Sequence, residues 1–458
     1  MLVFRDIKLT DYKIYINFIK DNNLLNCESP FVTLIFWQKV YENRIAITED
    51  NIFLMSGSGK DALFRLPLGK NRDKALKEIF DYCGENKPLF WICEDEIKNG
   101  IPEILSENYN FIDSRDDFDY IYLRENLAKL GGKKYHSKRN HISAFSKKHT
   151  WNYRRITNDN ANDVRICAQK WYKSRECDKY LLNEKKGIDY LLSHLEELNV
   201  IGGAIYVENE VVAFTLGTEL NSEVFVTHIE KALPEYGESY TVINQEFAKN
   251  ELSKYKYINR EDDMGIEGVR KAKLSYKPEI LLKKYFCMPK NEVESKNIYT
   301  EAFGAEEKEF TDALFSNCFK YLKQLIKNGK AVSELFLLPC ELETNGEKQE
   351  ANYLFAAATL NSQRGKGYMS ELIEKVKKES KAPIFLRPAD KNLIKFYEQK
   401  GFKLISARNS LNGKINLIPK NEFKNLMPFA DAPDNSEFDF MVYGKEINET
   451  VNFSYSFD

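Results

Sequence analysis

Apolar and polar residues follow one another in short blocks along the chain, and the clearest succession lies between residues 353 and 378. Residues 353–360 form an apolar run that predicts a buried strand. After a polar turn, apolar side chains recur at Met369, Leu372, Ile373 and Val376, which is the spacing of one helix face. The pattern therefore predicts a strand, a glycine turn and the beginning of an amphipathic helix.

The turn itself reads Arg364-Gly365-Lys366-Gly367. The first N–H groups of a helix have no partner within the helix and lie at the positive end of its dipole. Glycines let a phosphate approach such a backbone, and the two basic side chains add positive charge. The turn is neither a Walker loop nor a G-x-G-x-x-G dinucleotide motif. We therefore interpret it as a cradle for a pyrophosphate.

A similar order of elements is predicted earlier in the chain. Residues 202–220 predict a hairpin, residues 223–231 a third strand, 240–252 a helix and 257–261 a strand. Strict alternation along the third strand would place His228 and Glu230 on the same face.

Residues 1–125 also alternate short strands and a helix, but the turn at residues 67–71 lacks a second glycine, so its phosphate site would be degraded. In the last part of the chain, residues 310–325 predict a helix, and Asp390 is expected to cap a helix over residues 391–399. The polar stretch 287–296 predicts a linker. With 458 residues, the chain is expected to hold three domains, at 1–125, 126–290 and 291–458.

The amino-acid composition restricts the kinds of molecule that the protein is expected to bind. The formal net charge is -2, so overall charge attracts neither nucleic acid nor a membrane surface. No apolar run is long enough to span a bilayer, which predicts no integral membrane segment. The eight cysteines form no C-x-x-C pair, so we expect no metal site, no disulfide scaffold and a cytoplasmic location. Residues 133–149 are densely basic, and form either a solvated helix face or a contact with phosphates such as those of tRNA.

Arg364-Gly365-Lys366-Gly367-Tyr368-Met369 resembles the R-x-x-G-x-G/A motif of the GNAT N-acetyltransferases, with Met369 in place of the last small residue. Residues 392–402 resemble a second GNAT segment, N-x-x-x-x-x-Y-x-x-x-G-F. The resemblance implies acetyl-CoA or coenzyme A as cofactor and Tyr397 as the acid that protonates the departing thiolate; the alternative for Tyr397 is a core residue. The implied cofactor-binding residues are Leu360, Arg364, Gly365, Lys366, Gly367, Tyr368, Met369 and Asn392.

The segments GKKYHSKRNHISAF, THIEK, INQEF and DDMGIEGVRKAKLSY are similar to a bacterial family related to the C-terminal domain of phosphatidylglycerol lysyltransferase. That family is built as two GNAT-like units in tandem, like the Fem aminoacyltransferases, and the resemblance covers residues 1–290. It makes His228 and Glu230 catalytic candidates, with ion pairs that stabilise the fold as the alternative. The substrate-binding candidates are Lys138, Arg139, Asp263, Arg270, Lys271 and Lys273.

The expected fold class is α/β (α+β), with three GNAT-like folds whose mixed central sheets are flanked by helices. The leading functional hypothesis is a coenzyme A-dependent N-acetyltransferase acting through residues 291–458 on a small-molecule or peptide amine. A second hypothesis is an aminoacyl-tRNA-dependent transferase acting through residues 126–290 on a lipid or peptidoglycan acceptor. A third is a binding module without catalysis.

Overall fold

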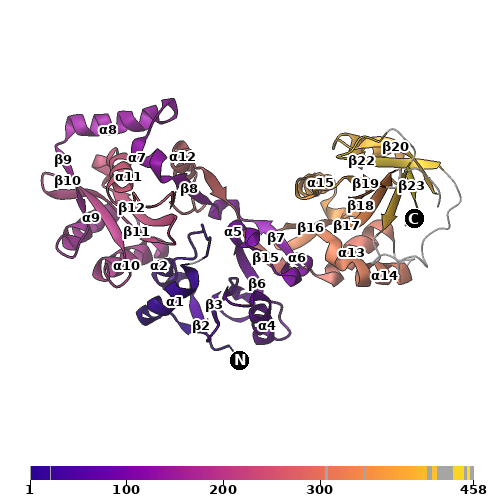
Figure 1. Ribbon diagram of the computed structural model, residues 1–458, viewed down its shortest axis with the longest axis horizontal. Helices are drawn as coiled ribbons and strands as arrows, with labels where there is room; N and C mark the ends of the chain where they lie inside the picture. Colours follow the sequence, from indigo (N-terminus) through magenta and orange to yellow (C-terminus); the bar gives the residue numbers. More distant parts are fainter. Residues whose placement is uncertain are drawn as a thin grey trace. The chain divides into compact units, whose positions relative to one another are not determined.

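A computed structural model describes residues 2–20, 22–304, 308–344, 347–409, 415–419, 437–447 and 451–453. The chain divides into two compact units, one of Met1–Pro102 with Phe111–Met288 and one of Glu103–Asn110 with Pro289–Asp458. Each unit is built from mixed sheets with helices packed against them (Figure 1). The predicted α/β class with three mixed sheets flanked by helices is confirmed.

The first sheet of unit 1 runs in the order β1-β2-β3-β4-β6-β15-β7, with β5 beside β3. Its strands are β1 (Arg5–Asp6), β2 (Arg44–Ile47), β3 (Asn51–Ser56), β4 (Leu63–Phe64), β5 (Leu68–Gly69), β6 (Leu89–Cys93), β7 (Tyr109–Asp113) and β15 (Lys284–Pro289). The accompanying helices are α1 (Tyr12–Ile19), α2 (Phe31–Phe36), α3 (Gln38–Tyr41), α4 (Arg72–Cys83) and α5 (Glu94–Lys98). Helix α4 begins at Arg72, where the Asn71 side chain accepts a hydrogen bond from the Lys74 N–H.

The second sheet of unit 1 runs in the order β14-β8-β13-β12-β11-β10-β9. Its strands are β8 (Asp119–Leu123), β9 (Trp151–Arg155), β10 (Ile201–Val207), β11 (Glu210–Glu219), β12 (Val224–Ala232), β13 (Tyr257–Asn259) and β14 (Ile280–Leu282). Helices α9 (Ala161–Lys173) and α10 (Lys179–Ser193) lie on one side, and α7 (Arg124–Lys129) and α11 (Ser239–Asn250) on the other (Figure 1). Helix α8 (His136–Lys148) packs on α11, and α12 (Glu267–Ser275) follows β13.

The two sheets of unit 1 exchange strands. Strand β8 comes directly after the first block of the sequence but pairs with β13 and β14 in the second sheet. Strand β15 comes after the second block but pairs with β6 in the first sheet, with Lys284 opposite Cys93. One hydrophobic core also extends from Tyr15 and Phe31 in the first block to Val164 and Phe214 in the second. The proposed division at residue 125 therefore stays a prediction, and the two halves share a core.

The sheet of unit 2 runs in the order β16-β17-β18-β19-β22-β20-β23-β21. Its strands are β16 (Leu322–Lys327), β17 (Lys330–Thr344), β18 (Glu347–Thr359), β19 (Ile384–Leu386), β20 (Lys403–Asn409), β21 (Ile415–Pro419), β22 (Glu437–Tyr443) and β23 (Val451–Phe453). Helices α13 (Glu292–Phe303) and α14 (Lys308–Cys318) bury one face, and α15 (Tyr368–Glu379) and α16 (Lys391–Glu398) bury the other. Helix α6 (Glu103–Asn108) also belongs to this unit.

Two predictions for this region are wrong in detail. The helix expected over residues 310–325 ends at Cys318, and β16 begins at Leu322, because Leu322 and Leu325 are buried in the sheet. The stretch 287–296 is not an irregular linker. It completes β15 and starts α13, whose first N–H groups are capped by the Asn291 side chain. The cap predicted at Asp390 is confirmed, since its carboxylate accepts from the N–H groups of Asn392 and Leu393.

Candidate acyl-transfer sites

The glycine turn of unit 2 leaves an open helix start. Gly365 and Gly367 have left-handed backbones with φ of +76° and +79°, a conformation that costs other residues free energy. A Cβ atom added at either position would meet nothing within 4 Å. Gly367 is the N-cap of α15, so no side chain caps the first turn of that helix. Arg364 and Lys366 are exposed beside it. The backbone amides of this turn are thus accessible and flanked by two cations.

The strand that leads into this turn carries a β-bulge. Glu334 pairs with Ala358 and Phe336 with Phe355, so two residues of β18, Ala356 and Ala357, lie opposite a single residue of β17. Ala356 has φ of +49°, which a sequence pattern of alanines gives no reason to expect. The parallel pairing of β18 with β19 ends at Tyr353 and Phe385, so the two strands are unpaired over the rest of β18. The bulge and the unpaired strand end lie directly before the glycine turn.

The remaining candidates of unit 2 lie on or before α16. Tyr397 is buried, with 6% of its surface exposed, and its ring contacts the rings of Phe396 and Phe402 edge-on. Burial raises the pKa of Tyr397 to about 12. Asn392 is exposed near the beginning of the helix. Leu360 directly follows β18, and its N–H donates to the Val332 carbonyl of β17. Tyr397 packs in a hydrophobic cluster, so its surroundings are those of a core residue.

In unit 1, strand β12 precedes a helix and a parallel strand as β18 does in unit 2, and β12 also carries a bulge. Leu216 of β11 pairs with Ile229 and Gly217 pairs with Thr227, so His228 is the extra residue of β12. The His228 ring lies between two partners, with Nε2 2.8 Å from Thr218 Oγ1 and Nδ1 2.9 Å from Glu261 Oε1. The alternation predicted for His228 and Glu230 does not hold through the bulge, and the two side chains contact different groups.

Glu230 belongs to a separate polar cluster. Its carboxylate accepts hydrogen bonds from Arg260 Nη2 at 2.6 Å and from Asn244 Nδ2 at 3.1 Å. The Arg260 Nη1 and Asn244 Oδ1 atoms are buried without a hydrogen-bond partner. Lys138 lies over the Tyr276 ring at 3.7 Å, and burial together with Arg260 lowers the pKa of Lys138 to about 8. The structure thus brings two predicted site residues, Glu230 and Lys138, to one cluster that has unused hydrogen-bonding capacity.

Three of the other candidates hold the loop after β13 in place. Asp263 is fully buried and accepts from Tyr120, Arg270 and the Gly265 N–H. Burial opposes its charge, but these hydrogen bonds outweigh burial and hold the pKa of Asp263 well below its usual range. Lys273 donates to the carbonyls of Arg260 and Asp262, and burial lowers its pKa.

The last two candidates are Arg139 and Lys271. Arg139 donates to the carbonyls of Leu130 and Gly132, just beyond the end of α7, and Lys271 is exposed. Asp263 and Arg270 form an ion pair that stabilises the fold, whereas Arg139 and Lys273 donate to carbonyl groups.

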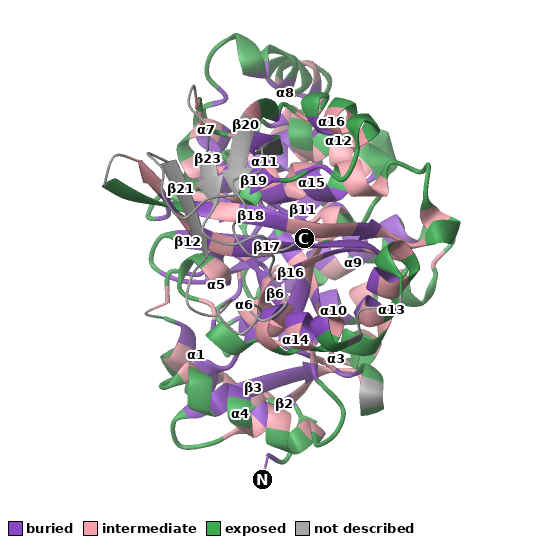
Figure 2. Ribbon diagram, turned by 90° about the vertical axis from the view of Figure 1, so that its right-hand side faces the viewer, coloured by how far each residue is buried: buried purple, intermediate pink, exposed green. Residues whose placement is uncertain are grey.

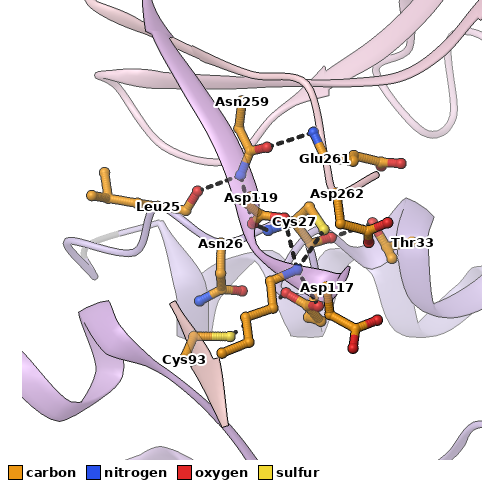
Figure 3. Close-up of polar contacts among 12 residues, drawn as sticks. Leu25, Asn26, Cys27, Thr33, Cys93, Asp117, Asp119, Asn259, Glu261 and Asp262 are labelled. Atoms are coloured by element: carbon orange, nitrogen blue, oxygen red, sulfur yellow. Dashed lines mark hydrogen bonds and ion pairs between the residues drawn. The ribbon is translucent and has the colours of Figure 1, made fainter. Parts of the chain in front are cut away.

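Sequence reasoning missed a buried charged centre in unit 1. Lys284 has no exposed surface, and its ammonium lies 2.6 Å from Glu28 Oε1 and 2.7 Å from Asp119 Oδ1. Burial opposes this charge, but Asp119, Cys27 and Glu28 outweigh it and raise the pKa of Lys284. Figure 3 shows Asp119 and Cys27 facing the same interior space, with Asn259 linking Asp119 to the Leu25 carbonyl. Residues far apart in sequence meet here, so no local motif signals the site.

Two family descriptions match the chain, and they meet where the two units divide. Residues 22–288 match "Phosphatidylglycerol lysyltransferase, C-terminal". The chain belongs to this family. Residues 289–405 match "Acetyltransferase (GNAT) domain". Both predicted resemblances are confirmed, and the chain carries a lysyltransferase-type region followed by a GNAT acyltransferase-type domain.

Individual proteins are also similar to this chain. A conserved protein of unknown function from Bacteroides thetaiotaomicron is 34% identical, covers 63% of this chain and 100% of its own, and superposes with a TM-score of 0.59. L-PGS from Bacillus licheniformis is 15% identical, covers 63% of this chain and 95% of its own, with a TM-score of 0.45.

An uncharacterised protein from Mycoplasmoides gallisepticum is 24% identical over 182 residues, which is 36% of this chain and 54% of that protein. The chain thus spans about half the length of this curated relative. Within the described ranges, no helix is both long and apolar enough to cross a bilayer.

Proposed function

We propose that the chain is a coenzyme A-dependent N-acetyltransferase whose cofactor binds at the start of α15. The observation that carries this proposal is the open glycine turn, in which two left-handed glycines, two exposed cations and uncapped helix amides occur together. A diphosphate fits this turn because no side chain fills the space above either glycine, and because the N-terminus of a helix favours an anion. The cofactor would supply the acetyl group as a thioester.

The neighbouring elements supply the other requirements of the reaction. The backbone of residues 364–369 would hold the pyrophosphate, and the bulge at Ala356–Ala357 frees backbone groups of β18 from regular pairing beside it. A freed N–H there would polarise the thioester carbonyl. Tyr397 remains protonated at neutral pH, since burial raises its pKa, and so could protonate a departing thiolate. The acceptor would be a small-molecule or peptide amine.

The test compares two glycine substitutions in unit 2. Gly367→Glu places a carboxylate in the turn, whereas Gly329→Glu places one at another left-handed glycine, with φ of +72° and equally open space. Both variants bear the same backbone strain, so their stabilities should fall alike. We expect Gly367→Glu to weaken acetyl-CoA binding in calorimetry at least about tenfold, or about 1.4 kcal/mol, and Gly329→Glu to leave it unchanged. Equal affinities in the two variants would refute the proposal.

We also propose an aminoacyl-tRNA-dependent transfer through unit 1 as a second candidate function. The observation that favours it is the cluster around Glu230, where Arg260 and Asn244 retain unused hydrogen-bonding atoms. Helix α8, which is basic and largely exposed in Figure 2, would contact the tRNA phosphates. Binding of tRNA that does not depend on the charge of α8 would argue against this function.

A further inference from the structure

Thr218, His228 and Glu261 form a hydrogen-bonded row that the proposed function does not use. The hydroxyl of Thr218 lies 2.8 Å from His228 Nε2, and His228 Nδ1 lies 2.9 Å from Glu261 Oε1. A carboxylate on Nδ1 requires that this nitrogen carries the proton, so Nε2 is left to accept from the threonine hydroxyl. Hydroxyl, imidazole and carboxylate are thus in the order and at the distances of an acyl-transfer triad.

The fold holds two members of the row, His228 and Glu261, by unusual local features. His228 is the extra residue of the β12 bulge, which directs its ring toward Thr218 of β11. Glu261 has a left-handed backbone with φ of +57°, a strained conformation for a residue with a side chain. Its N–H donates to the Asn259 side chain at 2.7 Å, and Asn259 in turn binds Asp119 of the buried centre (Figure 3). Strain supported in this way is typical of functional positions.

One end of the row opens to a cavity. A cavity of about 620 Å³ in unit 1 is lined by Thr218 together with residues of α1, of the segment before β10 and of the end of β11. Its wall is mainly apolar near Ile16 and Ile19, and polar near Asn199 and Lys254. His228 and Glu261 are not among its lining residues. Thr218 therefore lies between His228 and the space that a ligand could enter.

The strand edge at the cavity also offers a backbone donor. Pairing of β11 with β10 ends at Gly217 and Ile201, and the Leu220 N–H donates to Val224 on the β12 side. Because the N–H groups of a strand alternate between its two edges, the N–H of Glu219 is directed to the β10 edge, where the cavity lies. A donor one residue after the hydroxyl is suited to stabilise an oxyanion formed there.

We propose that Thr218 is an acyl-accepting nucleophile, with His228 as its base and Glu261 as the residue that positions His228. Thr218 Oγ1 attacks the carbonyl carbon of an acyl ester, and its proton passes to His228 Nε2. The bond between that carbon and the alcohol oxygen breaks, and the alcohol leaves with the proton from His228. The acyl group then rests on Thr218 as an ester, and an amine or hydroxyl acceptor in the cavity releases it by the reverse proton path.

The test uses the full chain and p-nitrophenyl acetate as the activated ester. We expect intact mass spectrometry to show one added acetyl group, assigned to Thr218 by peptide mapping. The acyl group should persist in Thr218→Ser, disappear in Thr218→Ala and His228→Gln, and form at least about tenfold more slowly in Glu261→Gln. The matched control is Thr215→Ala, which removes another buried threonine hydroxyl of β11 that only donates to the Ile229 carbonyl.

Two results would overturn the proposal. One is the absence of an acetyl group on Thr218 in the parent chain. The other is acylation of Thr218 in His228→Gln at the rate of the parent chain, because a hydroxyl that reacts without a base does not need the imidazole. The tryptophan emission of each variant, measured during urea unfolding, shows that unit 1 is folded before the comparison is made, since all four tryptophans lie in that unit.

Discussion

Replacing Lys284 by Met tests the buried charged centre of unit 1. The side chain of Lys284 has no exposed surface, and it neutralises Asp119, which is also fully buried, and Glu28, which is 12% exposed. Methionine fills a similar volume without the charge. Asp119 keeps the hydrogen bonds from the Cys27 N–H at 2.7 Å and from Asn259 at 2.8 Å, but both carboxylates lose their ammonium partner. The variant therefore buries negative charge that has lost its ammonium partner.

The expected loss follows from the cost of breaking a buried ion pair. Removing one partner typically destabilises a protein by about 3–5 kcal/mol, because the other charge remains buried. Burial already raises the pKa of Asp119 to about 7 in the parent chain. Without Lys284 that pKa rises further, and the pKa of Glu28 loses the ammonium that lowers it. A carboxyl group of this kind is protonated in the folded state and ionised in the unfolded state, so stability increases as pH falls. The deficit of the variant should therefore shrink between pH 7 and pH 5.

Tryptophan fluorescence isolates the relevant unit. Trp37, Trp91, Trp151 and Trp171 are all the tryptophans of the chain, and all lie in unit 1. With a urea dependence of about 3 kcal/mol per molar, the midpoint of Lys284→Met should fall by about 1 M or more at pH 7. The exposed Lys186→Met on α10 is the control and should leave the midpoint unchanged. A midpoint equal to that of the control, or a deficit that grows on acidification, would refute the reasoning.

Two further predictions concern a carboxyl group of unit 2 and the basic helix of unit 1. Burial raises the pKa of Glu334 to about 8, against hydrogen bonds from Ser295 and Gln324, so the parent should lose stability from about pH 5 to pH 8, by up to about 4 kcal/mol. Glu334→Gln should remove this loss in calorimetry, and an unchanged pH dependence would contradict it. Neutralising the exposed Lys133, Lys134 and Lys147 should reduce the salt dependence of tRNA binding by about 2–3 in the log–log slope, whereas the same change at Lys179, Lys185 and Lys186 of α10 should not.

Local sequence patterns predicted those helices, strands and turns whose characteristic residues recur at regular spacing. The glycine turn before α15, the hairpin of β10 and β11, and the cap at Asp390 were all predicted from a few neighbouring residues. Helix α12 was not predicted, because none of its residues is buried and no apolar period marks it. The predicted end of the helix over residues 310–325 was wrong, because Leu322 and Leu325 fit a helical spacing although they belong to strand β16.

The candidate sites depended on features that local patterns do not carry. A β-bulge adds one residue to a strand. The residues around His228 and Ala356 contain no sequence pattern that predicts the bulge at either position. Lys284 and its two carboxylate partners lie in three separate segments of the sequence, and the strand exchange between the two sheets brings them together. Thr218 was not a candidate at all, because its relation to His228 exists only across two paired strands. Sequence thus located His228 but not the two residues that give it a chemical context.

The residues directly before helices α15 and α11, which follow equivalent strands in the two units, indicate a different chemistry for each unit. In both, a bulged strand leads into a helix and then into a parallel strand: β18, α15 and β19 in unit 2, and β12, α11 and β13 in unit 1. Helix α15 is preceded by Arg364 and Lys366 with open glycines, which suits a diphosphate.

Helix α11 is instead preceded by Glu235 and by Glu238 at its N-cap, where Glu238 pairs with Lys148, so the position lacks the open glycines and exposed cations of the turn before α15. The bulge of unit 1 presents an imidazole where that of unit 2 presents alanines. We therefore expect unit 2 to act through backbone groups on a phosphate-bearing donor, and unit 1 to act through side chains on an ester.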